Sequence, residues 1–450
     1  MSAADRSPEA GRYGQRRFLL LAGLLLAAGL GLRLLVMFCI PTQPVSDFWS
    51  YFQRAVSLAD RGVYEAIAGR ADASYPPGYP LLLSLFFRLP FERLATARAV
   101  NLALAGVTIV LAALLGRRLF GDPASLLAAA LLAFYPRSIL QVLLIASENL
   151  FTPLLLAWLL VMLSPAAQRR CRLFFLGGLL LGALCLVRSV AWLLVIPWAV
   201  SQIPSRPPLR LFLARLCLLL AAQALVLLPW ALRNDRVLGS PTFLTTTGGI
   251  DLFIGNNPQA PGYWYPWLED MKEIDPGFST LTPVEQDRTA LKAAVAWMRA
   301  NPLDAARLYA GKLYLMIRDD YFILETTMFG DQISPPWPAA SVLPAGHPVK
   351  AFQPFLRVLV DASFWMLMLL EAAGAAACLS KWNNTGARIP AWLLPLLVAA
   401  YFPIVSAVFH VSSRLIWPSV DLLLPFAGHG LALFYPWMQR KIRRPGPGTS

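Results

Sequence analysis

The sequence predicts a mainly α-helical, polytopic membrane protein with about ten transmembrane helices. Of its 450 residues, 57% are hydrophobic and only 14% are charged, and the mean hydropathy is +0.56. One soluble core does not hide this much apolar surface, and the surface is divided into runs close to the roughly 20 residues that a spanning helix needs. The fold class therefore follows from the composition and from the length of the apolar runs.

The basic residues exclude one class of partner. The chain has a net charge of +14, but its Lys and Arg residues stand in short clusters between apolar runs. Such clusters are typical of cytoplasmic loops in membrane proteins, so no nucleic acid partner is expected. The five cysteines lie in or beside apolar runs without paired spacing. We expect them to be small buried side chains rather than a disulfide framework or a zinc site.

The N-terminus is predicted to lie in the cytoplasm, because four arginines precede the first apolar run. A first span over residues 18–40 then carries the chain to the outer face, where a loop over 41–95 begins. Within this loop the apolar run 81–89 is too short to span, and a proline pair and a glycine precede it. We expect interfacial helices here, so that the next span ends at a cytoplasmic pair, Arg117 and Arg118.

The length of the apolar runs and the cytoplasmic position of the basic clusters also place the remaining spans. Arginine clusters mark the later inner loops, and the last cluster, from Arg440 onward, puts the C-terminus in the cytoplasm. Arg188 separates two short apolar runs and is predicted to lie on the outer side. The ten predicted spans are 18–40, 96–115, 123–135, 148–163, 173–186, 190–203, 211–230, 355–379, 391–409 and 415–438.

The composition changes over residues 231–354, where most of the remaining Asp, Glu, Asn and Pro collect and no run of membrane length occurs. We predict a mixed domain on the outer face. A soluble helix over 283–300 is expected in it, with Thr282 as its cap, and an amphipathic run over 305–317 is expected on the bilayer surface. The predicted division is an N-terminal transmembrane module (1–230), this outer-face domain (231–354), and C-terminal transmembrane helices with a cytoplasmic tail (355–450).

Two isolated acids, Asp47 and Glu148, converge with several arginines on one face of the membrane in this topology. A partly desolvated carboxylate near cations can act as a general base on a hydroxyl, and guanidinium groups bind phosphate bidentately. No hydrolase triad and no Gly-rich phosphate loop is visible. The set suits chemistry on a lipid phosphate at the membrane surface. The arginines are Arg137, Arg188, Arg233 and Arg414.

Each of these residues also has a purely structural interpretation. Asp47 suits the N-cap of the helix that follows it, and Glu148 suits the first turn of a helix, where the dipole favours acids. Arg188 and Arg414, taken singly, suit anchors at the membrane interface. The proline-rich segment 75–80 suits a rigid turn. Spacing alone leaves these alternatives open.

A transporter or flippase of a lipid-linked or anionic substrate is the rival class. It would bury such charges at mid-membrane in broken helices, and many transporters show inverted repeats. The sequence shows no such repeat, and the charges gather at one predicted face. This pattern favours an enzyme.

A series of short motifs, spread in order over most of the chain, resembles the glycosyltransferase-C superfamily. The resemblance is to the bacterial branch related to protein O-mannosyltransferases and the lipid A aminoarabinose transferase. No single motif is specific, but their order and spacing together are. The motifs are Asp47 followed by YPPGYP at 75–80, GRRLFG at 116–121, Tyr135-Pro136 with Ser147-Glu148, GAL at 182–184 with Val187-Arg188, LPW at 228–230 with Arg233-Asn234, TGG at 247–249 with GNNP at 255–258, and Arg414 with Pro418.

The resemblance implies an inverting transfer of a sugar from a polyprenyl-phosphate carrier to a hydroxyl of a lipid, glycan or protein acceptor. It implies the bacterial plasma (inner) membrane as the location and its periplasmic or external face as the side of the chemistry. Asp47 matches the family's base or acceptor-binding acid. Glu148 matches a second acid that binds acceptor or metal, and the need for a divalent metal ion stays open.

The resemblance also implies binding residues. Tyr75 departs from many relatives, which have His before the proline pair, and with three histidines in the chain a histidine-built metal site is not expected. The implied donor-phosphate ligands are Arg188, Arg233 and Arg414. The implied acceptor or loop residues are Tyr75, Tyr79 and Asn256.

Overall fold

The computed structural model describes residues 8–442 apart from 68, 71, 167–169, 330–342, 344–345 and 383–389. Over these residues the chain is helical or irregular. No β-strand forms among them, and the only isolated bridge joins Tyr263 to Val411. The mainly α-helical fold predicted from the composition is confirmed.

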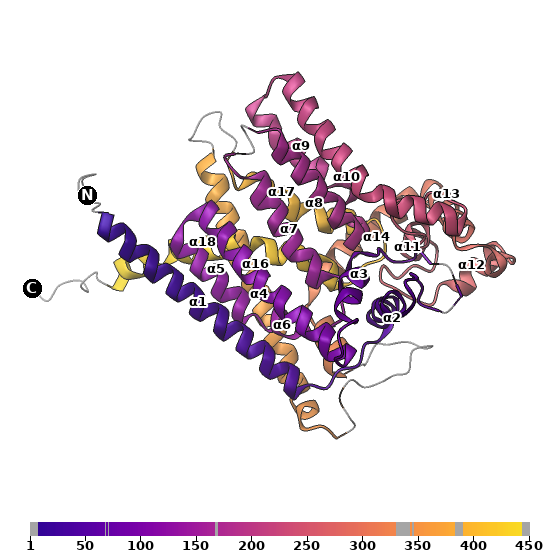
Figure 1. Ribbon diagram of the computed structural model, residues 1–450, viewed down its shortest axis with the longest axis horizontal. Coiled ribbons are helices and arrows are strands. Elements are labelled where there is room, and N and C mark those ends of the chain that lie inside the picture. The colour runs from indigo at the N-terminus through magenta and orange to yellow at the C-terminus, as the bar shows by residue number, and fades with distance from the viewer. Residues whose placement is uncertain are drawn as a thin grey trace, which may run out of the picture.

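Long apolar helices form a bundle in which α1 begins and α18 ends at the left of the view in Figure 1. A helix stands at every position where the sequence predicts a span. The stretch predicted as 190–203 is broken into short helical pieces around α9. The bundle helices are α1 (Pro8–Cys39), α4 (Arg93–Phe120), α5 (Asp122–Phe134), α7 (Glu148–Met162), α8 (Arg172–Val187), α9 (Val195–Gln202), α10 (Leu209–Leu238), α16 (Gln353–Trp382), α17 (Leu393–Ser406) and α18 (Trp417–Ile442).

Several of these helices are long and apolar enough to cross a membrane. Within the described residues five qualify singly, and a sixth span forms if α5 and the helical stretch after it, which meet at a bend of 58°, count as one. Helices α7, α8 and α17 are apolar but shorter. The chain is therefore a multi-pass membrane protein, whereas the count of ten spans stays a prediction.

Close backbone contact between helices α8 and α10 depends on glycine. A Cβ at Gly178 of α8 would lie 2.4 Å from the carbonyl oxygen of Leu219 on α10, so a larger residue would force the two helices apart. Small residues are common at helix contacts in membranes, because close packing replaces the hydrophobic driving force that water would supply. The bundle is thus held by shape as well as by apolar surface.

A buried charge cluster ties distant segments of the bundle together. Arg137, on the short helix α6 (Pro136–Leu140), is fully buried and forms an ion pair with Asp421 of α18. Its Nε lies 3.5 Å from Oδ2 of Asp320, which also accepts hydrogen bonds of 2.7 Å from Tyr135 and Trp417. Arg137 therefore acts within the bundle, away from the two candidate acids.

Residues 248–300 form a helical region at the right of Figure 1, beside the helices of the first loop. A capping box between Thr282 and Glu285 starts the predicted helix, as expected. The region has a small core of its own around Phe253, Met271 and Phe278. Its helices are α11 (Gly248–Gly255), α12 (Leu268–Ile274) and α13 (Pro283–Ala300), α14 (Pro302–Arg318) follows them in the chain, and the first-loop helices are α2 (Ser46–Arg61) and α3 (Gly78–Phe86).

Two further expectations from the sequence concern the run 81–89 and the cysteines. The run 81–89 forms only the nine-residue helix α3 and the turn after it, which agrees with the prediction that it does not span. The expectation that all cysteines are buried is wrong for Cys39, Cys171 and Cys217. Cys39 is the last residue of α1, Cys171 directly precedes α8, and Cys217 lies within α10.

Candidate active site

Asp47 lies in the first turn of α2, and its carboxylate has two partners. The hydroxyl of Tyr75 donates to Oδ1 at 2.6 Å, and the guanidinium of Arg414 forms an ion pair with Oδ2. Val45 occupies the N-cap position and makes no side-chain cap bond, so the N-cap interpretation of Asp47 is wrong. The side chain is 27% exposed and is therefore accessible to a substrate.

The backbone directly before Asp47 adopts an unusual conformation. Ser46 has φ of +51°, a region that residues other than glycine adopt at a steric cost. Such strain persists only where the surrounding contacts hold it, and it occurs often at functional sites. The sharp turn at Ser46 sets the direction in which α2 presents Asp47.

Glu148 lies in the first turn of α7 and is buried, with 1% of its surface exposed. Its Oε1 pairs with Nη1 of Arg188 and lies 4.0 Å from Nε of Arg414. Arg414 therefore stands between Asp47 and Glu148. The four residues form an alternating array of acids and arginines, which we call the Asp47–Arg188 array: Asp47, Arg414, Glu148 and Arg188.

A serine and a tyrosine support this array. Ser147 Oγ accepts hydrogen bonds of 3.3 Å from the Tyr51 hydroxyl and from Nη1 of Arg188. The Tyr51 ring also packs edge-on against Tyr75, with ring centroids 5.1 Å apart. The motif Ser147-Glu148 and the segment beginning at Tyr75 are thus joined through Tyr51, which the sequence analysis did not select.

The array fixes the charge of its members at neutral pH. Burial opposes the ionisation of Asp47, but Arg414 and the hydrogen bond from Tyr75 outweigh it and lower the pKa of that carboxyl below 3.8. Burial and the neighbouring Asp47 raise the pKa of the Tyr75 hydroxyl well above its usual range. Asp47 is therefore an anion and Tyr75 a neutral donor.

Helix α11 and the segment after α17 lie on another side of the array. A Cβ at Gly255 would lie 2.4 Å from the carbonyl carbon of Phe409, so glycine permits the close approach of these two segments. The Asn256 side chain then donates to the Val408 carbonyl at 2.8 Å. Asn256 fastens α11 to this segment, a structural role within the GNNP motif.

The close approach brings two more titratable groups to the site. Nδ1 of His410 lies 3.8 Å from Oδ1 of Asp251. Burial lowers the pKa of His410 to about 4. Burial and the nearby carboxylates of Asp47 and Asp287 raise the pKa of Asp251 to about 7. His410 is therefore neutral at physiological pH, while Asp251 titrates there.

Lys312 of α14 is buried beside Asn256. Only 1% of its surface is exposed, and its Nζ donates to Oδ1 of Asn256 at 3.1 Å and to the Val408 carbonyl at 3.5 Å. Burial lowers its pKa to about 8. No partner for Lys312 could be predicted from the sequence, in which it is a single cation within an amphipathic run.

The structure does not bring two of the candidate residues to the array. Arg233 donates to the carbonyl oxygens of Asp72 and Tyr64, at 2.6 and 2.9 Å, and so holds the first loop against α10. Tyr79 is fully buried and donates to Oδ1 of Asn101 at 2.7 Å. Both contacts stabilise the packing of the loop that carries Asp47.

A metal ion does not fit the residues of this site. Asp47 and Glu148 are each paired with an arginine, which supplies the positive charge that a metal would otherwise bring. Over the described ranges, no group of three or more His, Cys, Asp or Glu side chains is arranged to hold a metal ion. The side chains of the site therefore supply its charges by themselves.

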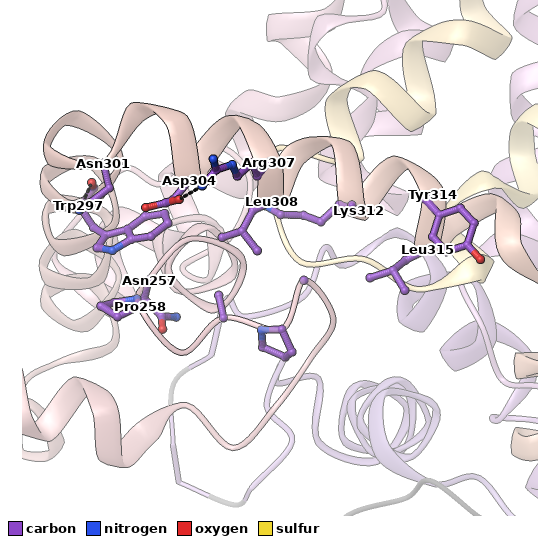
Figure 2. Close-up of a pocket in the computed structure, with 14 residues that line it drawn as sticks. Asn257, Pro258, Trp297, Asn301, Asp304, Arg307, Leu308, Lys312, Tyr314 and Leu315 are labelled. Carbon is purple, nitrogen blue, oxygen red and sulfur yellow. Dashed lines mark hydrogen bonds and ion pairs between the residues drawn. The ribbon is translucent and has the colours of Figure 1, made fainter.

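A groove of about 800 Å³ opens between α14 and the loop that follows α11. Figure 2 shows Trp297, Asp304 and Leu308 along one side and Asn257 and Pro258 opposite them. Its lining includes Lys312 but none of the four residues of the Asp47–Arg188 array. The groove thus reaches the lysine rather than the acids.

Part of the chain is similar to a known protein family. Residues 74–232 match the family described as dolichyl-phosphate-mannose-protein mannosyltransferase. This segment holds the YPPGYP motif, Glu148 and Arg188 but neither Asp47 nor Arg414. No curated protein sequence matches the chain.

Solved structures of an archaeal oligosaccharyltransferase share the fold. The archaeal oligosaccharyltransferase AglB from Archaeoglobus fulgidus, in complex with an inhibitory peptide and a dolichol-phosphate, aligns with a TM-score of 0.51 at 13% identity, over 96% of this chain and 53% of that one. Its apo form aligns with the same TM-score at 14% identity, over 96% and 53% of the two chains. ArnT from Cupriavidus metallidurans bound to undecaprenyl phosphate aligns with a TM-score of 0.41 at 16% identity, over 96% and 81%.

These comparisons confirm the resemblance to the glycosyltransferase-C superfamily that the motifs indicate. The fold and the site define a multi-pass membrane protein with an acid in its first loop. The chain spans about half the length of the oligosaccharyltransferases it matches.

Proposed function

We propose that the protein is a membrane glycosyltransferase that moves a sugar from a polyprenyl-phosphate donor to an acceptor hydroxyl, with inversion at the anomeric carbon. The Asp47–Arg188 array carries the proposal, because it presents an accessible carboxylate next to fixed cations. The mannosyltransferase family match supports the reaction class. The AglB complex, which shares the fold, contains a dolichol-phosphate and so supports a lipid-phosphate donor.

Asp47 is the proposed base. The acceptor oxygen bonds to the anomeric carbon as the bond from that carbon to the phosphate oxygen breaks, and the electron pair of this bond leaves with the phosphate. The acceptor proton passes to Asp47. A carboxylate with a lowered pKa is a weak base, so it takes the proton late, when the new bond has made the acceptor oxygen acidic. Attack opposite the leaving phosphate gives inversion.

The other members of the array orient Asp47 and stabilise charge. Arg414 contacts both Asp47 and Glu148, so two carboxylates hold it in one position. Arg188 pairs with Glu148 and balances its charge. A fixed guanidinium can stabilise negative charge that develops nearby without reorganising. Tyr75 keeps one oxygen of Asp47 occupied, which leaves the carboxylate a defined orientation toward the acceptor.

The proposed location is the bacterial plasma membrane, with both termini in the cytoplasm and the Asp47–Arg188 array at the outer face. The arginine clusters at both ends of the chain and in the predicted inner loops support this orientation. A lipid, a glycan or a protein at the outer face would then be the acceptor. Residues 1–230, 231–354 and 355–450 are the proposed modules.

Substitution of Asp47 tests the base assignment. We expect Asp47→Asn to lower transfer from a labelled polyprenyl-phosphate sugar in washed membranes by at least about 100-fold, the usual range for loss of a general base. Asp60→Asn is the matched control, because Asp60 lies on the same helix but pairs with Arg93 at the surface. Full transfer activity of a normally inserted Asp47→Asn protein would refute the assignment.

The rival function, a transporter or flippase, has one observation in its favour. The ion pair of Arg137 and Asp421 is buried in the bundle, next to the bend between α5 and α6. Such buried pairs occur in substrate pathways, but they also lock helices together. Reconstituted vesicles separate the two functions, because a flippase would move a labelled polyprenyl-phosphate sugar across the bilayer without forming a glycoside.

A further inference from the structure

Lys312 is a buried cation without an acidic partner. Its hydrogen bonds go to the side-chain oxygen of Asn256 and the carbonyl of Val408, which are both neutral. In the part of the chain that the structure describes, it forms no ion pair. An unpaired charge is costly to bury, so proteins rarely keep one unless it has a function. Burial accordingly lowers the pKa of Lys312 to about 8.

The arginines near Asp47 are already occupied. Arg414 pairs with Asp47 and contacts Glu148, and Arg188 pairs with Glu148. An anionic ligand would have to compete with these fixed carboxylates for either arginine. Lys312 has only neutral partners to give up, so an anion that reaches it meets no competing carboxylate.

The groove leads to this lysine. One wall is α14, which carries Lys312, and the other is the loop from Asn257 to Gly262. Nonpolar atoms of Pro261, Leu308 and Leu315 line its course, and the volume of about 800 Å³ is sufficient for a phosphate group and the start of an attached chain. The groove therefore combines an apolar path with one buried cation.

His410 connects the surroundings of Lys312 with the array. The charges of Lys312, Asp47 and Arg414 all act on its imidazole, so the lysine and the acid are both within electrostatic range of the same histidine. The Val408 carbonyl, which accepts from Lys312, is two residues before His410. Because His410 is neutral at physiological pH, it adds no charge to this region.

We propose that Lys312 binds the phosphate of the polyprenyl-phosphate donor, which enters along the groove between α14 and the loop 257–262. This inference rests on the proposed function and assigns the leaving-group side of the reaction. As the bond between the anomeric carbon and the phosphate oxygen breaks, the ammonium of Lys312 stabilises the charge that the phosphate gains. Asp47 receives the acceptor proton on the opposite side of the sugar.

Binding to the full-length protein in detergent and phosphate-free buffer tests the assignment. Undecaprenyl phosphate, undecaprenol and inorganic phosphate are titrated separately, with tryptophan fluorescence as the readout. We expect Lys312→Met to weaken the binding of undecaprenyl phosphate at least tenfold. The unaltered protein should bind undecaprenol and inorganic phosphate more weakly than it binds undecaprenyl phosphate. Lys292→Met, at an exposed lysine on α13, is the matched control and should bind as the unaltered protein does.

The possible outcomes separate this inference from the proposed function. Equal binding of undecaprenyl phosphate to Lys312→Met and to the unaltered protein would overturn the role of Lys312, even if Asp47→Asn abolished transfer. Equal binding of undecaprenol would show that the headgroup is not recognised and would also overturn it. Lys312-dependent binding of inorganic phosphate, as tight as that of the lipid, would assign the groove to a free phosphate instead. Absence of sugar transfer by the unaltered protein would refute the proposed function, whatever Lys312 binds.

Discussion

Replacing Lys312 with methionine should stabilise the protein at neutral pH, although the same change should weaken phosphate binding. Burial lowers the pKa of Lys312 from 10.5 to about 8. Because one pKa unit corresponds to about 1.4 kcal/mol, keeping this lysine protonated in the folded state costs about 3 kcal/mol. Methionine removes that cost but also removes the hydrogen bond to Asn256, worth about 1 kcal/mol. The expected net gain is about 2 kcal/mol at pH 7.

The stability difference between Lys312→Met and the unaltered protein should depend on pH. The folded state binds the Lys312 proton less tightly than the unfolded state, so the cost is fully present below about pH 8 and disappears as the pH rises through 10.5. The advantage of Lys312→Met should therefore shrink over this interval and reverse above it, where only the lost hydrogen bond remains.

Thermal unfolding in detergent, followed by tryptophan fluorescence from pH 7 to 10.5, measures this difference. The control is Lys292→Met, since Lys292 is exposed and its replacement should change the unfolding temperature little and without such a trend. A Lys312→Met protein that unfolds at a lower temperature than the unaltered protein at pH 7, or at a constant difference across the range, would refute the assignment of an uncompensated buried charge.

Three further predictions follow from other contacts. Gly255→Ala should destabilise the protein by about 1–3 kcal/mol in thermal unfolding, because its Cβ meets backbone atoms, whereas Gly248→Ala, with nothing within 4 Å of the added Cβ, should not clash. Arg137→Met should cost about 3–5 kcal/mol, because it leaves two buried carboxylates without their cation, and an unchanged unfolding temperature would contradict this. Tyr75→Phe removes a bond that lowers the pKa of Asp47, so the acid limb of the pH profile of sugar transfer should move to higher pH; a limb that stays in place would separate Tyr75 from catalysis.

The helices of the bundle could be predicted from the sequence because each is a long apolar run bounded by charge or proline. The capped helix α13 was predictable for a similar reason, since its start depends on Thr282 and Glu285, three residues apart. The breaks were less predictable. The predicted span 190–203 became short helical pieces, and α5 meets the helical stretch that begins at Pro136 at a bend of 58°, an angle that the sequence does not specify.

The sequence was sufficient to select the residues of the candidate site, but not to show how they contact one another. Asp47, Glu148, Arg188 and Arg414 are separated by up to 367 positions, and only the fold shows that they alternate. Composition and spacing could not distinguish Arg233 from Arg414, because both were predicted to place a guanidinium group at the same membrane face. The partners differ: Arg233 holds two backbone carbonyls, and Arg414 holds two carboxylates.

Lys312 shows most clearly what sequence alone leaves open. In the sequence it is one cation in an amphipathic run, where the ordinary expectation is an exposed side chain. The close contact of Gly255 with Phe409 places Asn256 against the Val408 carbonyl, and these two acceptors then bury the lysine. An apolar residue at this position would make the folded protein more stable than the buried lysine does. The buried charge and the groove that Lys312 lines together support the proposal that this lysine is kept for an anionic substrate at the expense of stability.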